Sequence, residues 1–140
     1  MNRSLLDTDI LSEILKQRDS NVAARAKEYV AEHGRLTLSS ITVLEIVRGY
    51  RRVGREAKVT TFEFALRGCT VLPFDEAAGR LAGRIYADLE LRGRPIGMPD
   101  VMIASIAIEN GLVLSTGNTA HFEAVQAAGY PLAIENWRTA

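Results

Sequence analysis

Several residue types are scarce in this 140-residue chain, and each scarcity argues against a class of protein. The single cysteine, Cys69, excludes an internal disulfide framework and a zinc site built from cysteines, and we expect its thiol to be buried. No apolar run approaches the length of a membrane span, and Asp7 comes too early for the apolar segment of a signal peptide. We therefore expect a cytoplasmic protein with no membrane association.

An excess of charge of either sign is also lacking, because 17 basic residues balance 17 acidic ones. Bulk electrostatics therefore does not indicate a nucleic-acid-binding protein. The basic residues are nevertheless biased, since 14 of the 17 are arginine. Arginine suits bidentate contacts with phosphate and carboxylate groups, but it is also common on ordinary helix surfaces.

The residues that are present predict one compact α/β domain over residues 1–140. Hydrophobic residues make up 47% of the chain and prolines number only 4, which leaves room for a substantial core. Short apolar runs alternate with helical patterns, and this predicts right-handed βαβ units and a parallel sheet covered on both faces. Strands are expected at 3–7, 36–39, 70–72, 112–114 and 131–134.

The most informative stretch is a predicted helix that is apolar on nearly every side. From Val101 to Ile108 every residue except Ser105 is apolar, so such a helix belongs in a core. Asp100 stands at its start, directly after Pro99, a residue suited to the first turn of a helix. An acid in this position commonly caps a helix or complements its dipole, and that role stays open for Asp100.

Two further acids lie at the edges of other apolar runs. Asp7 ends the first predicted strand, and Glu45 lies about one turn into the helix after the second. A polar cluster, 115–119, follows the fourth strand. Because sites in open parallel sheets form at the carboxyl ends of the strands, we expect Asp7, Glu45 and Asp100 to converge there. The alternative for Glu45 is an exposed helix residue that pairs with Arg48, three positions on.

Three carboxylates gathered near one point would repel one another, and a divalent cation would relieve this repulsion. Oxygen ligands without cysteine or paired histidine favour Mg²⁺ or Mn²⁺ over zinc. Such a site activates water and binds phosphate oxygens during hydrolysis. The acidic residues therefore indicate a metal-dependent hydrolase.

Helix starts offer capping roles to several other polar residues. Thr8 or Asp9 is expected to cap the first helix, and Ser40 or Thr42 the helix that carries Glu45. Asp75 is interpreted as the cap of a long helix that reaches about residue 91.

Five segments, at 5–12, 40–49, 72–75, 92–104 and 115–122, resemble those of the PIN-domain nucleases, in particular the VapC-like toxins of bacterial toxin–antitoxin systems. They occur in the family's order, and the likeness extends from about Ser4 to Trp137. The resemblance implies a PIN-like three-layer α/β fold with a five-stranded parallel sheet flanked by helices. It further implies that residues 1–140 form a single PIN domain.

The resemblance implies an endoribonuclease that depends on Mg²⁺, with Mn²⁺ as a substitute, and acts as the toxin of a toxin–antitoxin pair. It assigns Asp7, Glu45 and Asp100 as catalytic residues and metal ligands, with Asp7 and Asp100 as the principal ligands and Glu45 as their acidic partner. Structured RNA such as tRNA is the implied substrate. A PIN-type RNA-processing nuclease without a toxin role, or a catalytically silent binding module, is the alternative.

The supporting polar residues depart partly from the family pattern. Thr116 and Asn118 match the polar lobe after the fourth strand, where the family often has a further acid at the position of Asn118 or of His121. Both are non-acidic here, which bears on whether a second metal ion binds. Asp9 stands where the family usually has asparagine, so it is either an additional acid of the site or the helix cap. His121 either packs at the surface beside the site or assists RNA or metal binding.

Arginines flank the predicted site. Arg48 and Arg52 share a helical face with Glu45, and Arg92 and Arg94 precede Asp100, so all four are predicted to bind RNA. The alternative is an ordinary solvated face. The family resemblance adds two partners: a small antitoxin protein whose tail occupies the acidic cleft, and a second copy of the chain in a homodimer.

Overall fold

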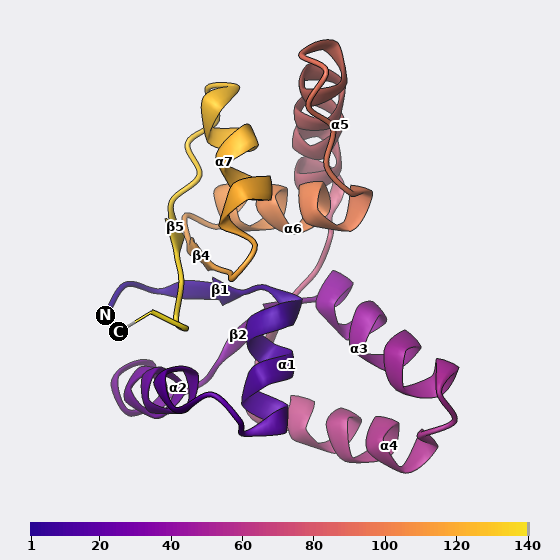
Figure 1. Ribbon diagram of the computed structural model, residues 1–140, viewed down its shortest axis with the longest axis vertical. Coiled ribbons are helices and arrows are strands. Elements are labelled where there is room, and N and C mark those ends of the chain that lie inside the picture. Colours follow the sequence, from indigo (N-terminus) through magenta and orange to yellow (C-terminus); the bar gives the residue numbers. More distant parts are fainter. Residues whose placement is uncertain (140) are drawn as a thin grey trace.

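A computed structural model describes residues 1–139 and contains a five-stranded sheet with all neighbouring strands parallel (Figure 1). The strands are β1 (Ser4–Leu6), β2 (Thr37–Ser39), β3 (Thr70–Leu72), β4 (Val113–Ser115) and β5 (Ile134–Glu135). Their order across the sheet is β3-β2-β1-β4-β5, which puts β1 at the centre. The predicted parallel α/β fold is confirmed, although β5 begins later than the expected 131–134.

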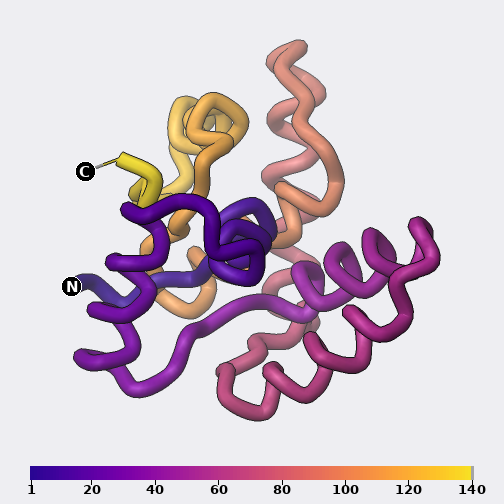
Figure 2. Tube along the Cα trace, turned by 60° about the horizontal axis from the view of Figure 1, so that its bottom comes forward, coloured from indigo at the N-terminus to yellow at the C-terminus, as the bar shows by residue number. Residues whose placement is uncertain are grey.

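Helices cover both faces of this sheet, and the three-layer prediction is confirmed (Figures 1 and 2). The helices are α1 (Thr8–Lys16), α2 (Ser20–His33), α3 (Ser40–Arg52), α4 (Glu56–Ala65), α5 (Glu76–Leu91), α6 (Met98–Glu109) and α7 (Thr119–Ala127). α5, α6 and α7 pack on one face around Leu5 and Leu114, whereas α1, α2 and parts of α3 and α4 pack on the other around Leu6 and Leu38. Successive strand residues thus enter opposite cores, as the alternation of a strand requires.

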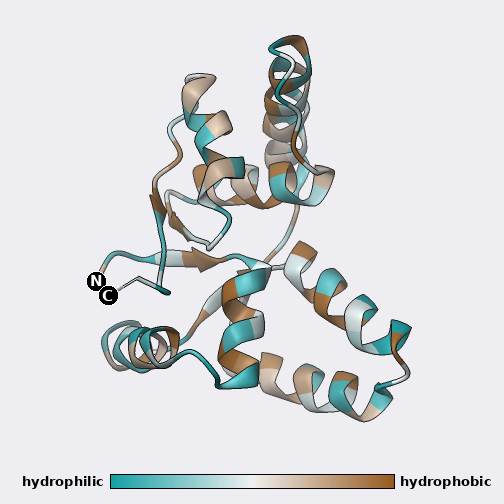
Figure 3. Ribbon diagram, viewed as in Figure 1, coloured by the Kyte–Doolittle hydropathy of each residue, from teal (hydrophilic) through white to brown (hydrophobic). Residues whose placement is uncertain are grey.

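The predicted apolar helix is α6, and it lies in the core. Its residues Val101 and Ile103–Ala107 are all buried, because α6 is enclosed by the sheet, α5 and α7. Figure 3 shows mostly hydrophobic residues in α6 and the central strands, whereas hydrophilic residues recur along α1, α3 and α4. Pro99 lies in the first turn, where its missing N–H leaves no hydrogen bond unmade.

The N-cap of α1 is Asp7, which corrects the expected Thr8 or Asp9. Asp7 has extended backbone angles, and its carboxylate accepts a hydrogen bond from the Thr8 N–H at 2.8 Å. Because β1 ends at Leu6 and passes into α1 without a loop, the last extended residue is the one that meets the free N–H groups. Asp9 is left inside the first turn, and its carboxylate contacts another segment.

The N-cap of α3 is Ser39, not Ser40 or Thr42, for the same reason. The Ser39 Oγ accepts a hydrogen bond from the Thr42 N–H at 3.1 Å. Asp75 caps α5 as predicted, since its carboxylate accepts a hydrogen bond from the Ala78 N–H at 2.9 Å.

The strand order creates a crevice beside β1. The chain leaves β1 for β2 and β3 on one side, then returns to β4 and β5 on the other. The carboxyl ends of β1 and β4 therefore lie at the point where the winding direction reverses, and ligands of open α/β sheets bind at such a point. Asp7 and Thr116 directly follow these two strands.

Within residues 1–139, no helix is both long and apolar enough to cross a membrane. Cys69, which was expected to be buried, is only half-buried, and partial burial raises the pKa of its thiol. Its position directly before the edge strand β3 explains this exposure.

Candidate active site

Asp7 is the centre of the polar cluster at the crevice. The residue is 2% exposed, and its backbone N–H continues the pairing of β1 with β4 by donating to the Ser115 carbonyl at 2.9 Å. Its Oδ1 accepts the Thr8 N–H, and its Oδ2 accepts the Thr116 hydroxyl at 2.8 Å. The carboxylate is thus held in one orientation by groups from α1 and from the loop after β4.

Burial raises the pKa of Asp7 to about 7. The hydrogen bonds from Thr116 and Thr8 lower this pKa, and the negative charges of Asp9 and Asp100 raise it further. Asp7, Asp9 and Asp100 therefore lie close enough for their charges to interact. The sequence predicted this proximity for Asp7 and Asp100. A bound cation would favour the ionised form of Asp7 at neutral pH.

Glu45 joins the site through Thr8. The Thr8 hydroxyl donates to Glu45 Oε1 at 2.6 Å and lies 2.9 Å from the Thr42 hydroxyl. The alternative pairing is wrong, because no ion pair joins Glu45 and Arg48 within the described residues 1–139. The sequence interpretation treated Thr8 only as a cap and missed this link. Its position directly after Asp7 was the available signal.

Asp100 meets His121 at the mouth of the crevice. The Asp100 Oδ2 lies 3.0 Å from the His121 Nδ1, and the His121 side chain is 55% exposed. The two residues come from the first turns of α6 and α7, which the fold brings together. Asp100 makes no capping hydrogen bond, so its carboxylate is available to the site, while its charge complements the α6 dipole.

Asp9 secures the loop after β4 instead of capping α1. Its Oδ2 accepts the Gly117 N–H at 2.9 Å, whereas its Oδ1 is buried without a hydrogen-bond partner. A Cβ on Gly117 would lie 2.5 Å from the same Oδ2, so glycine allows this close approach without a shift of Asp9 or the loop. Gly117 is a residue of the site that the sequence interpretation did not single out.

Thr116 and Asn118 shape the same loop. The Thr116 hydroxyl donates to Asp7 and accepts the Asn118 N–H at 2.9 Å. Asn118 is exposed and precedes α7, but its side chain makes no capping hydrogen bond. Thr116 therefore orients Asp7 directly, while the Asn118 side chain stands at the rim.

The donor set fits a hydrated divalent cation better than a caged one. Carboxylate oxygens dominate it, and the unpartnered Oδ1 of Asp9 adds a buried negative atom. However, among residues 1–139 no three Asp, Glu, His or Cys side chains lie close enough together to hold one ion. Mg²⁺ commonly binds through one or two carboxylates and keeps several water ligands, which matches this arrangement.

Comparison with known proteins now identifies the architecture. A sequence profile of the PIN domain matches residues 4–127. The tRNA(fMet)-specific endonuclease VapC of Shigella flexneri is 33% identical over 98% of this chain and 99% of its own length. The VapC ribonuclease Y4jK of Sinorhizobium fredii is 34% identical over 97% of this chain and 99% of its own length. The chain belongs to the VapC ribonucleases of the PIN-domain family.

Solved VapC structures share the whole arrangement. The DNA-bound VapBC of Salmonella typhimurium aligns with a TM-score of 0.80 at 30% identity, over 98% of this chain and 99% of the matched chain. VapBC-1 of nontypeable Haemophilus influenzae aligns with a TM-score of 0.81 at 28% identity, over 96% and 97%. The predicted PIN fold and VapC resemblance are both confirmed.

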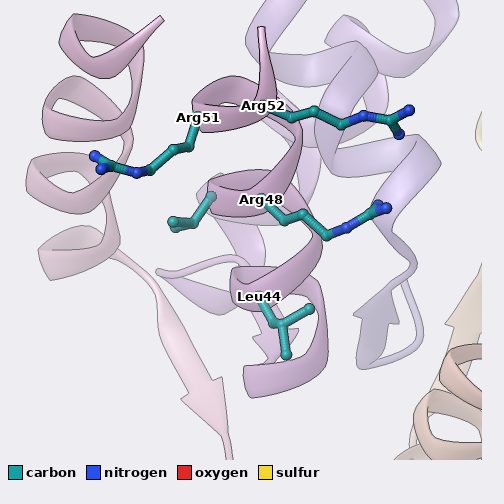
Figure 4. Close-up of a pocket in the computed structure, with 5 residues that line it drawn as sticks. Leu44, Arg48, Arg51 and Arg52 are labelled. Carbon is teal, nitrogen blue, oxygen red and sulfur yellow. The ribbon is translucent and has the colours of Figure 1, made fainter. Parts of the chain in front are cut away.

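In this VapC chain, two of the predicted RNA-binding arginines lie on an open face of α3. Arg48 and Arg52 extend from one side of the helix, and Arg51 extends from the other side toward α4 (Figure 4). Arg51 forms an ion pair with Glu56 at 2.9 Å. With Leu44 and Val47 these arginines line a shallow pocket, which flanks Glu45 but does not include the carboxylates.

The other two predicted arginines lie near the loop between α5 and α6. Arg92 donates from Nη1 to the carbonyl of Ala127 at 3.1 Å, so it also fastens the end of α7. Arg94 is exposed. The sequence analysis treated Arg92 and Arg94 alike, but in the structure they differ. Arg92 is held by its hydrogen bond to Ala127, whereas Arg94 is less constrained.

Proposed function

We propose that this chain is a metal-dependent endoribonuclease and the toxin of a toxin–antitoxin pair. The observation that carries the proposal is the buried Asp7 at the crevice, oriented by Thr116 and sharing its electrostatic environment with Asp9 and Asp100. The names of the relatives support RNA as the substrate, since they are ribonucleases and, in Shigella flexneri, a tRNA(fMet)-specific endonuclease.

Asp7 and Asp100 would hold the divalent cation, which is Mg²⁺ with Mn²⁺ as its substitute. When bound, such an ion would supply a water ligand of lowered pKa and positive charge next to the phosphate. Thr116 and the Thr8 N–H keep Asp7 oriented. Glu45 already uses Oε1 to accept the Thr8 hydroxyl, and it offers Oε2 to hold the attacking water.

Structured RNA such as tRNA is the proposed substrate, and a single-stranded segment of it is proposed to enter the crevice. An open crevice receives unpaired nucleotides more readily than a duplex, whose phosphates are spread over a wider surface. Arg48, Arg52, Arg92 and Arg94 lie outside the carboxylates and attract the phosphate backbone toward them. Because the substrate is RNA, we place the protein in the cytoplasm.

A small antitoxin is the proposed regulator. Related solved structures are VapBC complexes, including those of Salmonella typhimurium and Haemophilus influenzae. An arginine or lysine of the antitoxin tail would neutralise Asp7 and Asp100 in place of the cation and exclude the substrate. We further propose that the toxin forms a homodimer.

Cleavage of a tRNA pool by purified protein tests the activity. Wild type should cleave in Mg²⁺ and stop on addition of EDTA, whereas Asp7→Asn should bind RNA without cleaving it. Asp75→Asn, which alters a carboxylate at the start of α5, is the matched control and should keep its activity. Equal cleavage by wild type and Asp7→Asn would reject the assignment, and no cleavage by wild type would favour a silent binding module. A neighbouring reading frame for a small antitoxin would distinguish a toxin from an RNA-processing enzyme.

A further inference from the structure

A continuous groove leads away from the acidic site between α1 and α3. Its first part has a volume of about 280 Å³, begins at Thr8 and Glu45 and ends at Lys16 and Tyr50. Thr8 and Lys16 are two helical turns apart, so this part extends about 12 Å along α1 at 1.5 Å per residue. The groove therefore starts at the hydrogen bond that links Thr8 to Glu45.

Beyond Tyr50 the second part of the groove is larger in volume and basic. The second part has a volume of about 460 Å³ and shares Lys16 and Tyr50 with the first. Its other charged residues are Arg18, Arg55 and Lys58, which follow α1 or lie at the start of α4. Four cations from two segments of the chain thus line one end of a groove whose other end contains Glu45.

Three of these four cations have no neighbouring acid as a partner. Within residues 1–139, Lys16, Arg55 and Lys58 form no ion pair, whereas Arg18 pairs with Glu13 at 4.0 Å. A chain with zero net charge can attract a polyanion only through such local concentrations of positive charge. The groove therefore has the charge that a phosphate backbone requires.

The shape of the groove also suits a single strand. Gly49 lines its middle, and a Cβ there would meet nothing within 4 Å, so the missing side chain leaves the floor open. Tyr50 is half-buried at the junction of the two parts, where a base can stack on its ring. An open floor, an aromatic ring and unpaired cations together are the features of a single-stranded nucleic-acid channel.

We propose that this groove binds the phosphate backbone of single-stranded RNA on one side of the scissile bond, with Lys16, Arg55 and Lys58 as its main contacts. The proposal rests on the proposed ribonuclease function and adds a binding surface distinct from Arg48, Arg52, Arg92 and Arg94. RNA that enters here reaches Glu45 and Asp7 along α1 without crossing the basic face of α3.

Charge removal tests the electrostatic part. The groove variant replaces three of its cations with glutamine: Lys16→Gln, Arg55→Gln and Lys58→Gln. The control variant replaces three exposed cations elsewhere: Arg3→Gln, Lys27→Gln and Arg84→Gln. Both are made in the Asp7→Asn background, so RNA is not cut, and binding of a fluorescein-labelled oligouridine is measured by anisotropy over a KCl series. The groove variant should bind roughly 10-fold to 100-fold more weakly near 0.1 M salt, with a salt slope smaller by about 2.

Filling the groove tests its shape separately. Gly49→Gln adds an uncharged side chain at a helical position with open space, and Gly83→Gln on α5 is the matched control. Gly49→Gln should weaken oligouridine binding without changing the salt slope, whereas Gly83→Gln should leave both unchanged. Thermal unfolding of each variant shows that the fold is retained.

The outcomes separate this proposal from the function on which it rests. If wild type cleaves RNA but both groove variants bind oligouridine like their controls, the groove does not bind RNA and the proposal is rejected. A groove that binds a protein partner instead would give this same result. If wild type neither binds oligouridine nor cleaves RNA, the proposed function itself fails.

Discussion

At the residue scale, Asp7 combines roles that usually fall to separate side chains. It caps α1, accepts the Thr116 hydroxyl and forms the centre of the proposed metal site. The residue is only 2% exposed. Its negative charge therefore destabilises the folded state unless a cation or hydrogen-bond donors compensate it.

The pH dependence of stability should therefore report Asp7. Without metal, its pKa is about 7 in the folded chain and near 3.8 in the unfolded chain, so the folded state binds the proton more tightly. Ionisation then costs the folded state more, and stability should fall as pH rises from about 4 to about 7 and level off above that. At about 1.4 kcal/mol per pKa unit, the loss amounts to a few kcal/mol.

Urea unfolding in EDTA across this pH range measures the effect. Asp7→Asn should be nearly independent of pH and at least as stable as wild type above pH 7, because it removes the buried charge. Metal should restore stability to wild type above pH 7 and do little for the variant. A wild-type stability that rises from pH 4 to pH 7 would contradict the assignment.

The rim residues should control metal affinity. Asn118 is exposed beside the site and carries no charge, so we expect the free wild-type protein to bind one weak, largely hydrated ion. Asn118→Asp adds a charged oxygen and should tighten Mg²⁺ or Mn²⁺ binding by roughly tenfold in calorimetry. Asn2→Asp, remote from the site, should change nothing. Two tight sites in wild type, or no effect of Asn118→Asp, would contradict this expectation.

At the element scale, the site depends on how α1 and the loop after β4 fit together. The Gly117 N–H contacts Asp9 on α1, and Arg138 also approaches this glycine. The close approach explains why a glycine occupies a loop that otherwise consists of hydrogen-bonding side chains. The spacing of α1 and β4 thus sets the position of Thr116 relative to Asp7.

Gly117→Ala should disturb this fit. The added Cβ would lie 2.5 Å from the Asp9 Oδ2 and 3.1 Å from the Arg138 Nε, so these side chains or the loop must shift. We expect a loss of about 1–3 kcal/mol in the free energy of unfolding, together with weaker metal binding as Thr116 moves. Gly83→Ala, at an open helical position, should be neutral or slightly stabilising. Unchanged stability and metal affinity in Gly117→Ala would show that the loop adapts freely.

At the scale of the whole molecule, the end of the chain fastens the layers together. Trp137 is fully buried in the core with α1 and α2, 5.6 Å from the ring of Tyr29, and its Nε1–H donates to Glu135 Oε1 at 2.9 Å. Tyr29 in turn accepts the Ser4 N–H at 3.0 Å. Trp137, which follows the edge strand β5, therefore contacts Tyr29 of α2, and Tyr29 in turn contacts the central strand β1.

Trp137→Ala should destabilise the entire fold by about 3–5 kcal/mol, because it leaves a large cavity. Trp137→Phe keeps a ring but loses the hydrogen bond, and should cost roughly half as much. Since Trp137 is the only tryptophan, far-UV circular dichroism must follow the unfolding. A loss confined to the last residues, with an unchanged urea midpoint, would show that β5 frays independently.

The sequence by itself determined the order of helices and strands, the burial of α6 and the placement of acids where strands end. These features depend on local periodicity and on the alternation of a buried sheet, which nearby residues specify. The rule that parallel strands present their carboxyl ends on one edge predicted that Asp7, Glu45 and Asp100 would converge. Among residues 1–139, however, no three such side chains lie close enough to hold one ion.

Only the tertiary structure decided which side chains touch. Asp7 and Ser39 became the caps because each is the last extended residue before its helix, and where a strand ends depends on its pairing with a distant segment. The contacts of Asp100 with His121 and of Asp9 with Gly117 join residues 21 and 108 positions apart. Such contacts depend on strand order and helix packing, and no local pattern encodes them. The basic groove arose in the same way, since Lys16 and Arg55 come together only when α1 and α4 pack against α3.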